Sequence, residues 1–542
     1  MNWAKARSWL TSDRAIWCYV FLLALGPRLA PSWQFMDPDS AAFWLVRIKQ
    51  FANGLSGAGI HNLAPALHPG VTLLWLTAPI ELLHRATGPW HFIHGDPVAS
   101  YLMAIKVPVA VCTSLLAALV WWLSKQALPR RVAFWFSLLF ALDPLYLVYS
   151  RYVHLDALIT GFSISGLVAM YLATTKESRR HWYIGLILLT LAGLTRINGF
   201  VVLGFALALW VAFRPQRNHL RRDFLRAILV VIVTAVIVWP PLLFSPQRIL
   251  QLQESGLGLL LAPHEVSPNV DVHQPIRSLF YPIFILSRSS LLALILAGLG
   301  MWYCIRNFLK KDLRFAGWMA LFSAYYWVIL LLEPKKLDRY ALPLVGTLAL
   351  FGAYGLDWLW QRRRMVTWTR AGVILAFVMQ MSIIWRLAPY YQTYENVFGR
   401  FLENHTPLRV SEAFDPAWGE GMSEAADFIR SNNGEIESAA ASWYASVLCV
   451  YGLPRTMDHY PLSPSTQLEC PSKLWLLAEP TEAAWLILSR DMLRQNIYPG
   501  LITDIHRLGW QPTKVISLNG IPYIWIYKNL GGLQAHYTLS GK

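Results

Sequence analysis

The sequence predicts a polytopic α-helical membrane protein with about eleven spans and a C-terminal α/β domain outside the bilayer. The 542-residue chain is 55% hydrophobic and 14% charged, with a mean hydropathy of +0.39, whereas soluble proteins carry about 25% charged residues. Apolar runs of about 20 residues, long enough to cross the hydrocarbon layer, recur from Ile16 to Ala388 and then stop. Basic residues gather in every second connection between these runs.

The membrane part is expected to occupy residues 1–389. Residues 70–84 are also apolar, but a crossing there would invert the sides of all the later basic connections. We therefore expect an interfacial or re-entrant helix inside an outer loop of residues 34–97. The predicted crossings are residues 16–33, 98–124, 131–149, 155–174, 182–195, 197–213, 227–245, 284–305, 315–332, 341–360 and 371–388.

The basic connections set the predicted orientation, because cytoplasmic loops carry an excess of Lys and Arg. This rule puts the N-terminus in the cytoplasm, and an odd number of crossings puts the C-terminus on the opposite side. We expect a multi-pass protein of the plasma membrane, the inner membrane in a bacterium. The net charge of +16 does not indicate nucleic acid, because the basic residues form no single stripe interleaved with aromatics. The basic connections are Lys125–Arg131, Lys176–Arg180, Arg214–Arg226, Arg306–Arg314 and Arg362–Arg370.

Residues 390–542 are predicted to form one extracytoplasmic α/β domain. Residues 421–430 have the pattern of an amphipathic helix, and residues 484–489 have the pattern of a buried strand. Residues 514–528 have the pattern of a hairpin about Asn519-Gly520.

The five cysteines include no pair with the spacing of a zinc site. Cys449 and Cys470 both lie in the C-terminal domain. An oxidising compartment would allow a disulfide between them if the fold brings them together, and the sequence leaves this pairing open.

Carboxylates gather in the connections that this orientation places outside. Asp37 and Asp39 directly follow the first predicted span, and Asp156 lies at the outer end of the fourth. A carboxylate held at the membrane surface can act as a general base. The alternative is that Asp37 or Asp39 only caps the helix after the Pro38 turn, and this motif alone favours capping.

The segment SRYVHLDALITGF brings Arg151, His154 and Asp156 to the junction of two spans. Ionisable residues at such a place are candidates for a functional site. The alternatives are a helix cap or an ion pair between Arg151 and Asp156. We favour a functional role for Asp156, whereas a single His at an interface is more often polar filling than a metal ligand.

A second basic cluster, in the segment EPKKLDRYALP, departs from the positive-inside rule. Lys335, Lys336 and Arg339 lie at the outer end of the ninth predicted span. Arg binds phosphate oxygens through two parallel hydrogen bonds and Lys adds a point charge, so the cluster fits a lipid phosphate. The alternative, snorkelling to ordinary anionic headgroups, would place such charges on many outer loops. Because they are scarce elsewhere, we favour phosphate binding.

These motifs resemble those of polyprenyl-phosphate-dependent glycosyltransferases of the GT-C fold, in the branch with protein O-mannosyltransferases and lipid A aminoarabinose transferases. MDPDS occupies the place of an essential acidic residue in that family's first outer loop. His68-Pro69-Gly70 is similar to a later outer motif that begins His-Pro-Pro. SRYVHLDALITGF is similar to an Asp-bearing span junction, and KKLDRYALP to a basic and aromatic segment near the lipid phosphate.

The resemblance implies an inverting hexosyl- or pentosyltransferase that moves a sugar from polyprenyl phosphate to a hydroxyl of a protein, lipid or glycan. It implies a direct displacement in which a carboxylate takes the acceptor proton and cations neutralise the leaving phosphate. The implied roles are Asp37 as base, Asp39 and Asp156 as orienting or metal-binding carboxylates, Lys335, Lys336 and Arg339 as phosphate ligands, and His68, Arg151 and Tyr340 as site lining. The sequence establishes no cofactor. Whether a divalent metal ion takes part, with Asp37 and Asp156 as its ligands, stays open.

Two other functions remain open at this point. A transporter or flippase of lipid-linked sugars would use polar groups near spans, such as Arg196, Asn198 and Asp156, to line a pathway. DPDS followed by an aromatic residue also resembles the catalytic subunits of oligosaccharyltransferases, where such an aspartate binds a metal. Those enzymes carry a Trp-Trp-Asp motif in the soluble domain, whereas the Trp-Trp pair here, Trp121-Trp122, lies in a predicted span.

Overall fold

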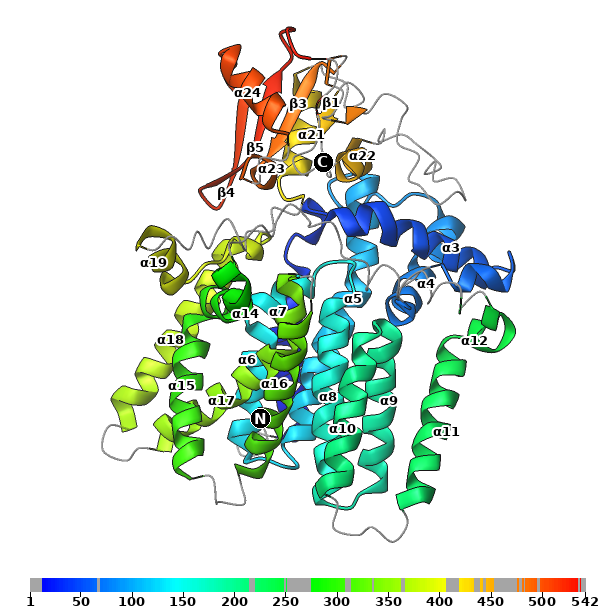
Figure 1. Ribbon diagram of the computed structural model, residues 1–542, viewed down its shortest axis with the longest axis vertical. Coiled ribbons are helices and arrows are strands. Elements are labelled where there is room, and N and C mark those ends of the chain that lie inside the picture. Colours follow the sequence, from blue (N-terminus) through cyan, green and yellow to red (C-terminus); the bar gives the residue numbers. More distant parts are fainter. Residues whose placement is uncertain are drawn as a thin grey trace, which may run out of the picture.

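Long helices run side by side in the computed structural model, and a small sheet lies beyond one end of them (Figure 1). Figure 1 shows shorter helices lying across that same end, between the long helices and the sheet. The structure describes residues 12–65, 69–213, 220–247, 250, 274–307, 313–333, 336–361, 366–405, 419–432, 439–441, 445–452, 475–476, 480–481, 483–494, 498–534 and 537.

A helix overlaps every crossing that the sequence predicts. Six of the described helices are long and apolar enough to cross a membrane, or seven if the bent pair Leu279–Arg288 and Leu291–Arg306 forms one span. The prediction of a polytopic α-helical protein is confirmed. The helices are α2 (Asp13–Leu29), α5 (Pro97–Ser124), α6 (Arg130–Leu142), α7 (Pro144–Tyr149), α8 (Asp156–Thr175), α9 (Arg179–Thr195), α10 (Asn198–Phe213), α11 (Leu220–Val238), α14 (Gln274–Arg288), α15 (Leu291–Arg306), α16 (Arg314–Leu332), α17 (Leu342–Gln361) and α18 (Val366–Leu387).

Helix α8 is buried along nearly its whole length and packs against α5, α9 and α17. Its sequence is apolar on all sides, which is typical of a helix surrounded by others. Gly166 allows the close approach of α9, because a Cβ there would lie only 2.6 Å from the side chain of Leu189. Since α8 and α9 are antiparallel neighbours, the first residue of α8, Asp156, faces Arg196 at the end of α9.

The connection between α2 and α5, residues 34–97 in the sequence prediction, contains the helices η2 (Ser40–Trp44), α3 (Leu45–Leu55), η3 (Ile60–Leu63) and α4 (Val71–Thr87). Hydrogen bonds attach this loop to the ends of the long helices. The indole of Trp75 donates to the carbonyl of Val238 at 2.7 Å, and the indole of Trp239 donates to Leu63 at 3.0 Å. The backbone of Gly70 donates to Thr195 at 3.1 Å, which anchors the loop beside the end of α9.

The sheet near the C-terminus has the strand order β2-β1-β3-β5-β4. Its strands are β1 (Ala439–Ala441), β2 (Trp475–Leu476), β3 (Trp485–Ser489), β4 (Lys514–Leu518) and β5 (Ile521–Lys528). The first three strands are parallel, while β5 runs antiparallel to both β3 and β4. Asn519 and Gly520 both have positive φ, as a tight hairpin turn between β4 and β5 requires. The predicted helix, buried strand and hairpin are confirmed.

Four described helices accompany the sheet, and two 3-10 turns and one more helix lie in the segments that follow α16 and α18. The four are α21 (Met422–Ser431), α22 (Ala445–Gly452), α23 (Arg490–Arg494) and α24 (Pro499–Arg507). The others are η6 (Asp338–Ala341), η8 (Tyr391–Thr393) and α19 (Val397–His405). Cys470 lies outside the described residues, so the Cys449–Cys470 disulfide stays a prediction.

Candidate active site

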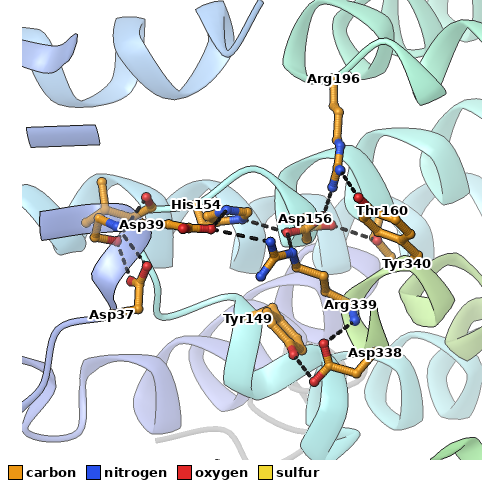
Figure 2. A network of polar contacts seen from close by, with 12 residues as sticks. Asp37, Asp39, Tyr149, His154, Asp156, Thr160, Arg196, Asp338, Arg339 and Tyr340 are labelled. Atoms are coloured by element: carbon orange, nitrogen blue, oxygen red, sulfur yellow. Dashed lines mark hydrogen bonds and ion pairs between the residues drawn. The ribbon is translucent and has the colours of Figure 1, made fainter. Parts of the chain in front are cut away.

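Four connections at the sheet-side end of the bundle bring charged side chains into one network (Figure 2). The turn before η2 supplies Asp37 and Asp39, and the α7–α8 connection supplies His154 and Asp156. The end of α9 supplies Arg196, and the turn η6 supplies Asp338, Arg339 and Tyr340. Residues separated by up to 300 positions in the chain therefore share a single cluster.

His154 lies between two carboxylates. Its Nδ1 atom is 2.6 Å from Oδ2 of Asp156, and its Nε2 atom is 3.3 Å from Oδ2 of Asp39. Burial alone would lower the pKa of His154, but the charge of Asp156 and the contacts with both carboxylates raise it to about 9. At neutral pH His154 is therefore an imidazolium that links the two carboxylates.

Asp39 is partly open to solvent, with 29% of its side chain exposed, whereas Asp156 is buried. The Oδ2 atom of Asp39 lies 3.3 Å from Nη2 of Arg339, in addition to its contact with His154. Burial would raise the pKa of Asp39, but the hydrogen bond from His154 and the charge of Arg339 outweigh that effect and lower it. Asp39 is therefore ionised and held in place by two cations.

Two arginines hold the other carboxylate. Nη1 of Arg196 lies 2.7 Å from Oδ1 of Asp156, and Nη2 of Arg196 donates to the hydroxyl of Tyr340 at 2.7 Å. Nε of Arg339 lies 3.6 Å from Oδ2 of Asp156. Arg339 thus contacts both Asp39 and Asp156, and the arginines approach Asp156 from two different elements.

Asp37 lies beside the charged cluster, but among the described residues its hydrogen bonds are with Ser40 and not with the cations. It is fully buried, and its carboxylate accepts from the backbone N–H of Ser40 at 2.8 Å and from the hydroxyl of Ser40. Burial raises the pKa of Asp37. These contacts are those of a helix cap, the alternative role that the sequence left open for this residue.

The structure brings Asp39, Asp156, Arg339 and Tyr340 together, as the sequence interpretation expects of site residues. Lys336 instead donates to the carbonyls of Leu330 at 2.6 Å and Leu331 at 3.1 Å, and so caps the end of α16. Lys335 and His68 lie outside the described residues.

Arg151 does not line the site; its contacts are with the backbone and aromatic rings beside it. Its guanidinium donates to the carbonyls of Ala30, at 2.8 Å, and Pro389, and it lies over the rings of Phe35 and Tyr391. Only 1% of Arg151 is exposed, which leaves it no surface for a substrate.

Sequence reasoning assigned Arg196 only to the transporter alternative and did not place it in the enzyme site. The sequence feature that could have indicated a site role for Arg196 is its position in the turn Thr195-Arg196-Ile197-Asn198, between two apolar runs. A charge there is costly unless it has a partner nearby. Its partner, Asp156, lies 40 positions earlier in the chain.

The cluster does not fit a divalent metal ion. Among the described residues, no group of three or more His, Cys, Asp or Glu side chains could hold one. Asp37 turns to Ser40, and Asp156 turns to His154 and Arg196. The positions around the carboxylates are taken by cationic side chains, which supply the positive charge that a metal ion would bring.

Comparisons with known proteins bear on the family and the fold. The family model "Dolichyl-phosphate-mannose-protein mannosyltransferase" matches residues 99–244, the segment that carries His154, Asp156 and Arg196. No curated protein sequence matches the chain. The apo structure of ArnT from Cupriavidus metallidurans superimposes with a TM-score of 0.50 at 14% identity, covering 98% of this chain and 100% of that one.

The chain has the GT-C fold of membrane glycosyltransferases. ArnT from Cupriavidus metallidurans bound to undecaprenyl phosphate matches this chain with a TM-score of 0.48 and 14% identity, over 98% of this chain and 100% of that one. The apo oligosaccharyltransferase of Archaeoglobus fulgidus matches with a TM-score of 0.46 and 12% identity, over 90% of this chain and 70% of that one. The predictions of the GT-C fold and of a glycosyltransferase are confirmed.

Proposed function

We propose that the chain transfers a sugar from a polyprenyl-phosphate donor to an acceptor hydroxyl at the outer face of the membrane, with inversion at the anomeric carbon. The observation that carries this proposal is the contact of the part-exposed carboxylate of Asp39 with Arg339, 3.3 Å away. A base for the acceptor and a cation for the leaving phosphate thus lie in the same site. Inversion requires attack from the face opposite the phosphate, so the two have to separate when the donor binds.

In the proposed step, the acceptor oxygen attacks the anomeric carbon while Asp39 takes the hydroxyl proton. The bond from that carbon to the phosphate oxygen breaks, and the electron pair leaves with the phosphate. Asp39 replaces Asp37 as the proposed base, because Asp37 is buried and its oxygens are occupied by Ser40.

Arg339 and Arg196 are the proposed phosphate ligands. A guanidinium can offer two parallel N–H groups to phosphate oxygens, and charge-assisted bonds of this kind are stronger than neutral ones. Arg339 has to turn from Asp39 towards the phosphate when the donor binds. His154 keeps Asp39 and Asp156 in place during that change, because it contacts both.

The membrane orientation that the sequence predicts is part of the same proposal. We place the N-terminus in the cytoplasm of a bacterial cell and the site at the outer face of the inner membrane. The membrane part would comprise residues 1–389, and residues 390–542 would form the extracytoplasmic domain. The basic residues in every second loop, which this orientation places together on the cytoplasmic side, support it.

The most direct assay uses the purified chain in detergent with a radiolabelled polyprenyl-phosphate sugar and a mixture of envelope proteins, lipids and glycans. The expected result is the release of polyprenyl phosphate together with transfer of label to one acceptor class. A parallel reaction contains the same sugar on polyprenyl pyrophosphate. Turnover of the pyrophosphate donor alone would contradict the proposed polyprenyl-phosphate donor. Transport of intact donor across proteoliposomes without bond cleavage would favour a flippase.

A further inference from the structure

The short segment Gly419-Glu420-Gly421, just before α21, lies against both connections that carry the acidic site residues. Through this segment, the C-terminal domain contacts the two connections close to Asp37 and His154. The residues that Figure 2 labels in the charged network all lie before residue 341.

Glu420 contacts the connection that carries His154. The hydroxyl of Tyr152 donates to Oε1 of Glu420 at 3.1 Å, and both side chains are buried. Tyr152 is two residues before His154, and its ring packs edge-on against Phe35 at a centroid distance of 5.2 Å. A buried carboxylate is costly without hydrogen bonds, so this contact holds Tyr152 in one orientation.

Gly419 contacts the turn that carries Asp37 and Asp39. It has a φ of +90°, and a Cβ at this position would lie 2.6 Å from the carbonyl oxygen of Met36. Met36 directly precedes Asp37. On α21, two residues after this segment, the hydroxyl of Ser423 donates to the carbonyl of Gln34 at 2.5 Å.

We infer that the C-terminal domain positions the site, and that Glu420, through its hydrogen bond with Tyr152, is a positioning residue for His154. The inference rests on the proposed function. Because His154 contacts Asp39 and Asp156, a shift of the connection that carries it alters the placement of the base. A misplacement of about 1 Å can lower the rate of an enzymatic step about 100-fold.

The test compares Glu420→Ala, Glu420→Gln and Tyr152→Phe in the full-length chain. Glu420→Ala should lower kcat for sugar transfer about 10-fold or more, with the donor KM within about twofold of wild type, because the phosphate ligands lie on other elements. Glu420→Gln should restore most of the rate, since its amide oxygen can accept the bond from Tyr152. Tyr152→Phe should resemble Glu420→Ala, and the double variant should be no slower than either single variant.

Asp427→Ala is the matched control, because Asp427 lies on the following helix, α21, with its side chain 65% exposed. It should leave kcat unchanged. If the wild-type chain transfers sugar and Glu420→Ala keeps its full kcat, the inference is wrong while the proposed function stands. Equal losses in Glu420→Gln and Glu420→Ala, or multiplying losses in the double variant, would also overturn it. Absence of transfer by the wild-type chain would count against the proposed function instead.

Discussion

Nη2 of Arg339 lies 3.3 Å from Oδ2 of Asp39, so the proposed phosphate ligand and the proposed base contact each other. This pairing keeps Asp39 ionised and in place. Donor binding would draw Arg339 towards the phosphate and leave Asp39 free to accept a proton. The site would thus be arranged so that a bound donor is needed before the base can act.

Replacement of Arg339 should weaken donor binding. Charge-assisted hydrogen bonds contribute about 1.5–3 kcal/mol, which corresponds to an increase in donor KM of about 10- to 150-fold for Arg339→Ala. Arg339→Lys should be intermediate, because Lys keeps the charge but not the paired donors. Steady-state kinetics with varied donor concentration measures this. Lys336→Ala is the control and should leave the donor KM unchanged, since Lys336 binds backbone carbonyls of α16. A normal KM in Arg339→Ala would remove Arg339 from the phosphate site.

The stability of the protein should fall in alkaline solution through His154. The pKa of His154 in the folded chain, about 9, is above the value of about 6.5 expected for the unfolded chain. Its contribution to stability is therefore fully present below about pH 6.5 and is lost as the pH rises through about 9. Thermal unfolding in detergent between pH 6 and pH 10 should show this loss. His154→Gln should flatten the profile in that window, and an identical profile in the variant would argue against an imidazolium at this position.

Transfer should not need a divalent metal ion. Cationic side chains surround Asp39 and Asp156, and the described residues contain no group of three or more potential ligands. Incubation with excess EDTA, followed by the transfer assay, should leave the rate within about twofold of the untreated enzyme, because the proposed chemistry relies on side-chain charges. Loss of activity that Mg²⁺ or Mn²⁺ restores would show that the site recruits a metal ion.

Lys106→Met should destabilise the turn that carries the carboxylates. Lys106 is buried on α5 and donates to the carbonyls of Ser32, at 2.7 Å, and Phe35. Loss of the donor leaves two buried acceptors, each at a cost of about 1–3 kcal/mol, and thermal unfolding in detergent measures the change. Lys125→Met provides the comparison, because Lys125 pairs with the half-exposed Asp13 and such pairs contribute less than about 1 kcal/mol. Equal stability of the two variants would contradict the role of Lys106.

The membrane architecture could be predicted from hydropathy and charge because both depend on the local sequence. Asp156, Arg339 and Tyr340 could also be predicted as site residues. Each lies at the end of an apolar run, where charged and polar groups are often functional. The partner of Arg196 could not be predicted, because only the antiparallel packing of α8 and α9 places Arg196 beside Asp156.

The finer roles depended on contacts that spacing does not reveal. Asp37 and Asp39 are two residues apart, yet the turn directs one towards Ser40 and the other towards His154. Lys336 belongs to a basic cluster in the sequence, but the free carbonyls at the end of α16 bind it. Lys106 lies within a long apolar run, where its carbonyl partners in a distant loop could not be predicted.

The comparison of Asp39→Asn with Asp37→Asn tests the central claim most directly. With a polyprenyl-phosphate sugar as donor, Asp39→Asn should lower kcat about 100- to 10,000-fold, the usual contribution of a general base, while binding of labelled donor remains. Asp37→Asn should keep a rate within about tenfold of wild type, because an Asn oxygen can still accept from Ser40. Full activity in Asp39→Asn together with loss of transfer in Asp37→Asn would contradict the account and make Asp37 the base.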